Sequence, residues 1–163
     1  SRSIPDQFNA NNLHRLAAEL RPVSLNHVGL DAALRQYAET AIVTPNIRVR
    51  YKARGFPAQR LPAEVETALF RIAQEAMTNA ARHADASRVD LLVEHRGDRV
   101  QLIIEDNGIG FDSGQVWDGD QIGLIGMRER AEGLGGTMTI ETAHGKGTTI
   151  VVEVPSADPN SDR

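Results

Sequence analysis

The chain has 163 residues, enough for one domain with a sizeable hydrophobic core, and 40 % hydrophobic with 25 % charged residues is ordinary for a globular protein. It has no cysteine, which excludes disulfides and thiolate metal sites, and no apolar run near the roughly 18 residues of a membrane span. The net charge of −4 gives no electrostatic reason to expect nucleic-acid binding. Residues 1–12 lack an initiator methionine and a signal-peptide pattern, so we expect a fragment of a longer chain.

The first third of the chain is predicted to form two helices and a strand. Residues 12–21 look helical and stop before Pro22. Residues 29–41 form a second helix with Asp31 in its first turn. Residues 47–51 alternate apolar and basic side chains, which indicates a half-buried strand.

The longest predicted helix covers residues 63–83, directly after Pro62, whose missing N–H costs nothing at a helix start. Apolar residues recur along it at about 100° per residue and share one stripe. The members of this stripe are Val65, Leu69, Ile72, Ala76 and Ala80.

The rest of the chain is predicted to form two hairpins separated by a helix. Strands at 87–95 and 99–105 are joined by a tight turn, and strands at 136–142 and 147–154 by the glycine-rich turn AHGKG. A flexible Gly- and Asp-rich loop precedes a helix at 122–133. Because the hairpins are antiparallel and the helices must cover one face, we expect an α+β, two-layer α/β sandwich with a mixed, mostly antiparallel sheet.

The long helix also carries a polar stripe beside its apolar face. Glu75, Asn79 and Arg82 are spaced i, i+4, i+7 and lie within about 60° of one another. An amide oxygen, a carboxylate and a cation together suit a hydrated divalent cation with phosphates. An equally good interpretation from the helix alone is a solvated flank with an intrahelical ion pair.

The segment EDNGIGF, residues 105–111, ends a predicted strand with a carboxylate. A strand end can hold Asp106 rigidly, and Gly108 and Gly110 would let a ligand approach the backbone closely. A buried carboxylate there could accept a hydrogen bond from an exocyclic amine such as that of adenine. The alternative is an ordinary Asn-Gly turn with a solvated aspartate.

Two further glycine clusters follow. The segment GLIGMRER, residues 123–130, would expose free N–H groups at a helix start, which suits a phosphate, although a plain junction between loop and helix would look the same. The segment GKGTT, residues 145–149, could be only a hairpin turn.

The order of these segments, with QEAMTNAARHA first and GLIGMRERAEGLGGTMTI later, resembles the N, G1, G2 and G3 boxes of the ATPase superfamily of gyrase, Hsp90, histidine kinase and MutL. More narrowly it resembles the catalytic ATP-binding domain of a two-component sensor histidine kinase of the nitrate-sensor (NarX/DesK-like) subfamily. The resemblance covers roughly residues 13–155. It implies the Bergerat ATP-binding fold, with residues 1–28 as the end of a dimerisation helix and linker, 29–155 as the catalytic domain and 156–163 as a flexible tail.

The resemblance also implies ATP and Mg²⁺ as cofactors and a role for each site residue. Asp106 would meet the adenine amine, Asn79 would hold the magnesium ion, and Glu75 occupies the position of the general base in ATP-hydrolysing members. Thr148 would support the adenine site through its hydroxyl. The remaining implied ATP-binding residues are Arg82 and His83 near the phosphates or ribose, and Gly108, Gly110, Gly123, Leu124, Gly126 and Met127 around the pocket and its lid. His83 could equally be a packed helix residue.

The sequence departs from a whole kinase because no stretch resembles the phosphoacceptor box. His14 is followed by arginine and is interpreted as a structural or solvent-facing residue. The implied partners are therefore ATP or ADP, the dimerisation and phosphoacceptor domain of a homodimeric parent, and a response regulator. No nucleic acid and no direct membrane contact are expected, and the fragment itself should be a cytoplasmic monomer, whether or not its parent is membrane-anchored.

Two other functions stay open on the sequence. One is a nucleotide-dependent binding module, and the other is an anti-sigma-factor-type serine kinase of the same superfamily. In any of these, residues 111–122 should be the most mobile internal segment without nucleotide and should become ordered with it, so the fluorescence of Trp117, the single tryptophan, should shift on adding Mg-ATP or Mg-ADP.

Overall fold

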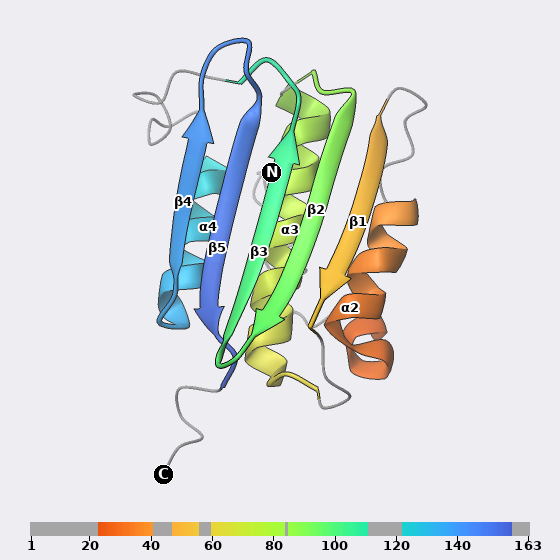
Figure 1. The fold of residues 1–163 in the computed structure, drawn as a ribbon, viewed down its shortest axis with the longest axis vertical. Coiled ribbons are helices and arrows are strands. Elements are labelled where there is room, and N and C mark those ends of the chain that lie inside the picture. The colour runs from red at the N-terminus through yellow and green to blue at the C-terminus, as the bar shows by residue number, and fades with distance from the viewer. Residues whose placement is uncertain (1–22, 41–46, 56–59, 84, 111–121, 158–163) are drawn as a thin grey trace, which may run out of the picture.

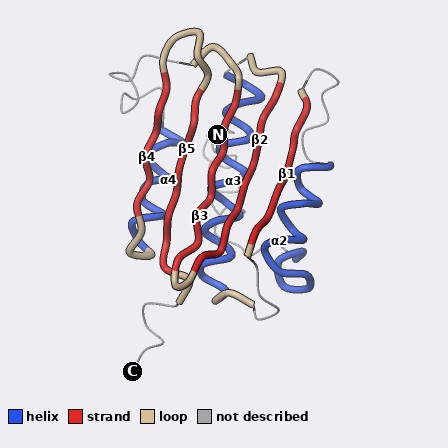
Figure 2. The backbone as a smooth tube through the Cα atoms, viewed as in Figure 1, coloured by secondary structure: helices blue, strands red, loops and turns tan. Residues whose placement is uncertain are grey.

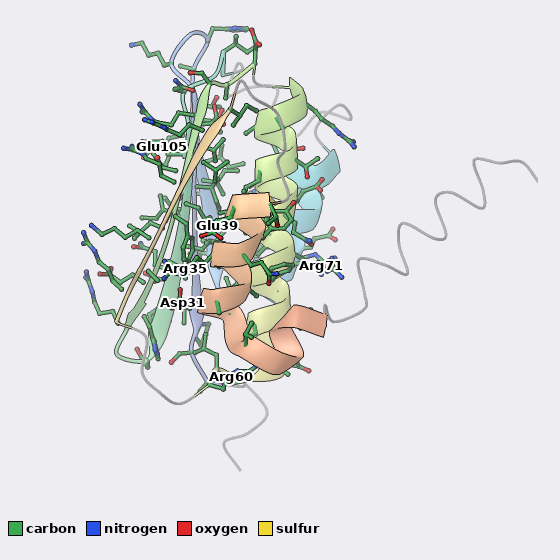
Figure 3. The ribbon with its side chains drawn as sticks, turned by 90° about the vertical axis from the view of Figure 1, so that its right-hand side faces the viewer. Asp31, Arg35, Glu39, Arg60, Arg71 and Glu105 are labelled. Carbon is green, nitrogen blue, oxygen red and sulfur yellow. The ribbon has the colours of Figure 1, made fainter. Side chains whose placement is uncertain are left out.

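The computed structural model describes residues 23–40, 47–55, 60–83, 85–110 and 122–157. In these ranges the chain forms a five-stranded sheet with three helices packed on one of its faces (Figure 1). The view in Figure 3 shows the helices on one side of the sheet and side chains such as that of Glu105 projecting from the other. The predicted α+β, two-layer architecture is confirmed.

The described elements follow one another in the order helix, strand, helix, two strands, helix, two strands. They are α2 (Val23–Thr40), β1 (Arg48–Arg54), α3 (Ala63–His83), β2 (Arg88–Arg96), β3 (Arg99–Asp106), α4 (Ile122–Gly133), β4 (Thr137–Thr142) and β5 (Thr148–Pro155). None of these helices is long and apolar enough to cross a bilayer.

The sheet has the spatial order β1-β2-β3-β5-β4. β1 runs parallel to β2, with α3 as the connection between them, and the other three pairs are antiparallel. The sheet is therefore mixed and mostly antiparallel, as predicted. In chain order β5 comes last, yet it lies between β3 and β4.

The core fills the space between the helices and the inner face of the sheet. The predicted apolar stripe of α3 is confirmed, because Val65, Leu69, Ile72, Ala76 and Ala80 are each at most 3 % exposed. Alternate residues of the central strands meet this stripe, as the burial pattern of β3 illustrates with Val100, Leu102 and Ile104 buried. The intervening residues of each strand project from the open face.

Two predicted elements differ from the structure by more than one residue at an end, and four strands differ by a single residue. The helix expected at 29–41 is the second part of α2, which starts at Val23 and is kinked at Gly29, where φ is 83° and ψ is 175°. The strand expected at 47–51 continues to Arg54, because parallel pairing with β2 carries it through residues of low strand propensity. The helix expected at 12–21 lies outside the described residues.

Side-chain contacts attach α2 and the start of α3 to the rest of the domain. The hydroxyl of Tyr51 on β1 donates to Asp31 Oδ1 of α2 at 2.8 Å. Glu66, only 2 % exposed in the first turn of α3, accepts two hydrogen bonds from the guanidinium of Arg60, at 3.0 and 2.8 Å. A buried carboxylate needs such a partner, since an unpaired charge there would be costly.

Candidate functional site

Most of the segments singled out by the sequence meet at one end of the sheet, the upper end in Figure 1. The last turns of α3, the end of β3, the start of α4 and the turn between β4 and β5 all face this end. Figure 2 shows the loops at this end lying above the ends of the strands. The topology thus brings together residues that are far apart in the sequence.

Asp106 lies at the centre of this end. It is the last residue of β3 and has the same parity as the buried Leu102 and Ile104, so it takes the last position on the helix-facing side of the strand. Across the sheet, Asp106 pairs with Thr148 of β5, and Thr148 in turn pairs with Thr142 of β4. The apolar pattern of the inner face therefore ends in a row of one carboxylate and two hydroxyls.

The Asp106 carboxylate is half-buried and held by the backbone. Its Oδ1 accepts a hydrogen bond from the N–H of Gly108 at 2.8 Å. Burial raises the pKa of Asp106 above its ordinary value, and hydrogen bonds from the backbone N–H groups of Gly108 and Thr148 offset only part of this rise. The result is a fixed hydrogen-bond acceptor in a partly desolvated position.

The neighbouring Asn107 fixes the end of β3 to the start of β2. Its Oδ1 accepts from the backbone N–H groups of Ser87 and Arg88, at 3.0 and 2.8 Å, and its Nδ2 donates to Ser87 Oγ at 2.8 Å. The backbone N–H of Asn107 donates to the carbonyl of Arg88. The sequence interpretation overlooked this role, although an asparagine directly after a strand often bonds to nearby backbone.

Replacing Asn107 by alanine is expected to lower the free energy of unfolding by about 1–2 kcal/mol, because three side-chain hydrogen bonds are lost at an exposed position. Urea denaturation followed by circular dichroism measures the change. Ser87→Ala is the matched control, since it removes only the bond to Asn107 Nδ2 and should cost much less. Equal losses in the two variants would contradict the assigned role.

Gly110 and Gly147 allow two loops to touch. A Cβ on Gly110 would lie 2.1 Å from the carbonyl oxygen of Ala143, and one on Gly147 would lie 2.2 Å from the carbonyl oxygen of Asp106. Both glycines also have positive φ, 64° and 75°. Gly110, expected to admit a ligand, is thus required by the protein backbone itself.

Thr148 is 7 % exposed, and its hydroxyl lies 3.0 Å from that of Thr142. The Thr142 hydroxyl also donates to the carbonyl of Gly147 at 3.2 Å. Thr142 was missed by the sequence interpretation. Its signal was a polar residue at an inward position where a strand ends.

The polar stripe of α3 approaches the same end of the sheet from the helix layer. Asn79 is half-buried and Arg82 is exposed. The side chain of His83 lies outside the described part. Glu75 lies one turn earlier, and its carboxylate contacts the first turn of α4.

The residues expected to bind ATP from α4 fall into two groups. Leu124 and Met127 are each 2 % exposed and belong to the core, so any contact of theirs with a nucleotide would be an apolar one. Gly123 and Gly126 lie inside the helix and not before it, and a Cβ on Gly126 would meet nothing within 4 Å. Segment 111–121, with Trp117, and His14 lie outside the described residues.

A depression of about 150 Å³ lies elsewhere, on the open face near the turn between β2 and β3. It is lined by Glu94, Arg96, Asp98, Arg99, Gln101 and Glu153. This is the opposite end of the sheet from Asp106, so the depression does not belong to the candidate site.

Comparison with known families agrees with this arrangement. A family model described as histidine kinase-, DNA gyrase B-, and HSP90-like ATPase matches residues 64–158. The chain belongs to this ATPase family. The match includes Asp106, the α3 stripe and the turn between β4 and β5, so the resemblance seen in the sequence is confirmed.

Two curated relatives are similar over most of the chain. The oxygen sensor histidine kinase NreB of Staphylococcus carnosus is 37 % identical over 147 residues, covering 90 % of this chain and 42 % of the relative. The signal transduction histidine-protein kinase/phosphatase DegS of Brevibacillus brevis is 38 % identical over 143 residues, covering 88 % and 36 %. The chain therefore spans less than half the length of either relative.

Solved structures show the same fold. The blue-light activated histidine kinase EL346 of Erythrobacter litoralis matches with a TM-score of 0.70 and 21 % identity, over 95 % of this chain and 51 % of that one. The ATP binding domain of PrrB from Mycobacterium tuberculosis matches with a TM-score of 0.54 and 26 % identity, over 78 % and 90 %.

Proposed function

We propose that this chain is the catalytic ATP-binding domain of a sensor histidine kinase. It binds Mg-ATP and presents the γ-phosphoryl to a histidine on the dimerisation domain of its parent, from which a response regulator receives it. The half-buried Asp106, fixed at the end of β3 by Gly108, carries the proposal. The family match and the two histidine kinase relatives support it.

The residues around Asp106 suit an adenine. A carboxylate has about four acceptor positions, and the hydrogen bonds from the N–H groups of Gly108 and Thr148 leave room for the donor of an exocyclic amine. The hydroxyls of Thr142 and Thr148 supply further polar partners beside it. The row is fixed by backbone contacts, so the acceptor is oriented before the nucleotide arrives.

The α3 stripe suits the phosphates and their metal ion. Asn79 offers an amide oxygen, the type of ligand that Mg²⁺ accepts, and the exposed Arg82 offers positive charge to phosphate oxygens. The bound ion would neutralise phosphate charge during transfer. This chain would contribute positioning and charge, which is most of what phosphoryl transfer requires of a protein.

The proposal is tested by mixing the chain with a separately produced dimerisation domain and labelled ATP. Transfer of label to an acid-labile site on that domain supports the kinase function. Binding of ATP without any transfer would favour a nucleotide-dependent binding module, and an acid-stable phosphoserine on a protein partner would favour the serine kinase.

Asn79→Ala should weaken nucleotide binding mainly when magnesium is present. We expect a loss of about tenfold or more in affinity for Mg-ADP, because the ion loses a protein ligand, and little change without metal. Calorimetric titrations with Mg²⁺ and with a chelator measure both. Similar losses under the two conditions would show that Asn79 does not act through the metal.

A further inference from the structure

Glu75 and Gly123 meet where α3 packs against the start of α4. A Cβ built on Gly123 would lie 2.1 Å from Glu75 Oε1, 3.0 Å from its Cδ and 3.2 Å from its Cγ. The first distance is shorter than real contacts allow and the other two are tight, so the space that a side chain at 123 would need is taken by the end of the Glu75 side chain. Gly123 is not among the glycines with positive φ, so its backbone conformation does not require glycine.

The position of the Glu75 carboxylate has an electrostatic consequence. Gly123 is the second residue of α4, and the first turn of a helix carries N–H groups without intrahelical partners and the positive end of the helix dipole. A carboxylate beside this turn is therefore stabilised there. Glu75 also lies close enough to α2 to contribute to the raised pKa of Tyr37, after burial as the main cause.

We infer that Glu75 is a positioning residue whose carboxylate holds the first turn of α4 against α3, and that Gly123 is the residue that makes room for it. This inference rests on the proposed function for its link to catalysis, because the start of α4 is the part expected to meet the phosphates. It assigns Glu75 a role other than that of general base. Glu75 then acts on the nucleotide through α4 and not through a proton.

A set of four proteins tests the contact: the wild type, Gly123→Ala, Glu75→Ala and the double variant. We expect Gly123→Ala to weaken Mg-ADP binding about threefold, because the new methyl group displaces the flexible Glu75 side chain from the first turn of α4. Glu75→Ala alone should cost about threefold. The double variant should bind no more weakly than Glu75→Ala, since the methyl group then has space.

Gly133→Ala is the matched control, because it adds the same methyl group to α4 at a place where nothing lies within 4 Å. It should bind Mg-ADP as the wild type does. Both substitutions favour the helix intrinsically, so a loss confined to Gly123→Ala cannot come from helix propensity. Equal behaviour of the two, or strictly additive losses in the double variant, would overturn the inference.

Glu75→Gln separates positioning from proton transfer in the assay with a separate dimerisation domain. We expect KM for ATP to rise while kcat stays within about threefold, whereas loss of a general base would lower kcat by about 100-fold or more with affinity unchanged. The second result would overturn the inference. If the wild type binds no nucleotide, the proposed function fails. The thermal unfolding midpoints of the same four proteins then still show whether Glu75 and Gly123 are in contact.

Discussion

Asp106→Asn is expected to weaken nucleotide binding by roughly 5- to 150-fold while the domain stays folded. The amide that replaces the carboxylate can turn a donor toward the adenine amine, and a mismatched polar contact at a buried position costs about 1–3 kcal/mol. Isothermal titration calorimetry with Mg-ADP measures the loss. Circular dichroism and thermal unfolding measure whether the fold is retained.

The Asp106→Asn variant should stay folded because the substitution removes a charge from a half-buried position. Burial raises the pKa of its carboxyl, so ionisation of this group opposes folding above the raised pKa. The asparagine variant has no such cost, and its Oδ1 can still accept from Gly108. At neutral pH its free energy of unfolding should therefore equal or exceed that of the wild type.

Glu105→Gln is the matched control for this change. It replaces the adjacent carboxylate by its amide, but Glu105 is exposed on the open face of the sheet (Figure 3) and accepts a hydrogen bond from Thr149 Oγ1 at 3.3 Å. Its affinity for Mg-ADP should be that of the wild type. If both variants lose affinity equally, or if Asp106→Asn binds normally, Asp106 does not meet the base.

The raised pKa of Asp106 also predicts how binding depends on pH. As the pH falls, Asp106 takes up a proton at a higher pH than an ordinary aspartate, and the acceptor for the adenine amine is then lost. As the pH is lowered, wild-type affinity should therefore begin to fall at a pH above the usual pKa range of aspartate, whereas the affinity of Asp106→Asn should show no such step. Nucleotide titrations of both proteins at a series of acidic pH values test this. A fall in affinity at the same pH in both proteins would mean that a group other than Asp106 is responsible.

Gly147→Ala should damage both the fold and the site. Its Cβ would collide at 2.2 Å with the backbone carbonyl of Asp106, and backbone atoms cannot move aside as a flexible side chain can. The positive φ of 75° adds about 1–2 kcal/mol of strain for a residue with a side chain. We expect a loss of unfolding free energy of about 3 kcal/mol or more, together with weakened Mg-ADP binding because Asp106 is displaced.

Gly145→Ala in the same turn separates these two causes. Its φ is 78°, nearly that of Gly147, but a Cβ there would meet nothing within 4 Å. Gly145→Ala should lose only the unfolding free energy that comes from backbone strain, and it should keep its affinity for Mg-ADP. Equal effects on unfolding and binding in the two variants would mean that the contact between the β4–β5 turn and Asp106 does not matter.

Local patterns predicted most elements because each follows from short-range physics. The stripe from Val65 to Ala80 identified α3, and the alternation in residues 99–105 identified β3. The extension of β1 to Arg54 could not be predicted, because it depends on pairing with β2, a strand some forty residues later. The insertion of β5 between β3 and β4 is likewise decided by packing and not by any local signal.

The candidate site could be proposed from the sequence where a residue type carries its own chemistry. A carboxylate at a strand end followed by glycines identified Asp106, and its fixed position is what the structure adds. The sequence could not show why glycine occupies positions 110, 123 and 147, because each of these glycines makes room for a partner that is remote in sequence. Thr142 was missed although its partner Thr148 is close by in the same hairpin, because its role depends on the register of that hairpin.

The place of β5 has a consequence for synthesis on the ribosome. A nascent chain translated only as far as β4 exposes the edge of β3 that β5 later covers, and β4 has no neighbour to pair with. Gly147 and Thr148, which adjoin Asp106 in the folded sheet, are also missing at that stage. The sheet can therefore be completed, and the nucleotide site formed, only after residues 148–155 have left the exit tunnel. Until then the unpaired edge of β3 is exposed to aggregation.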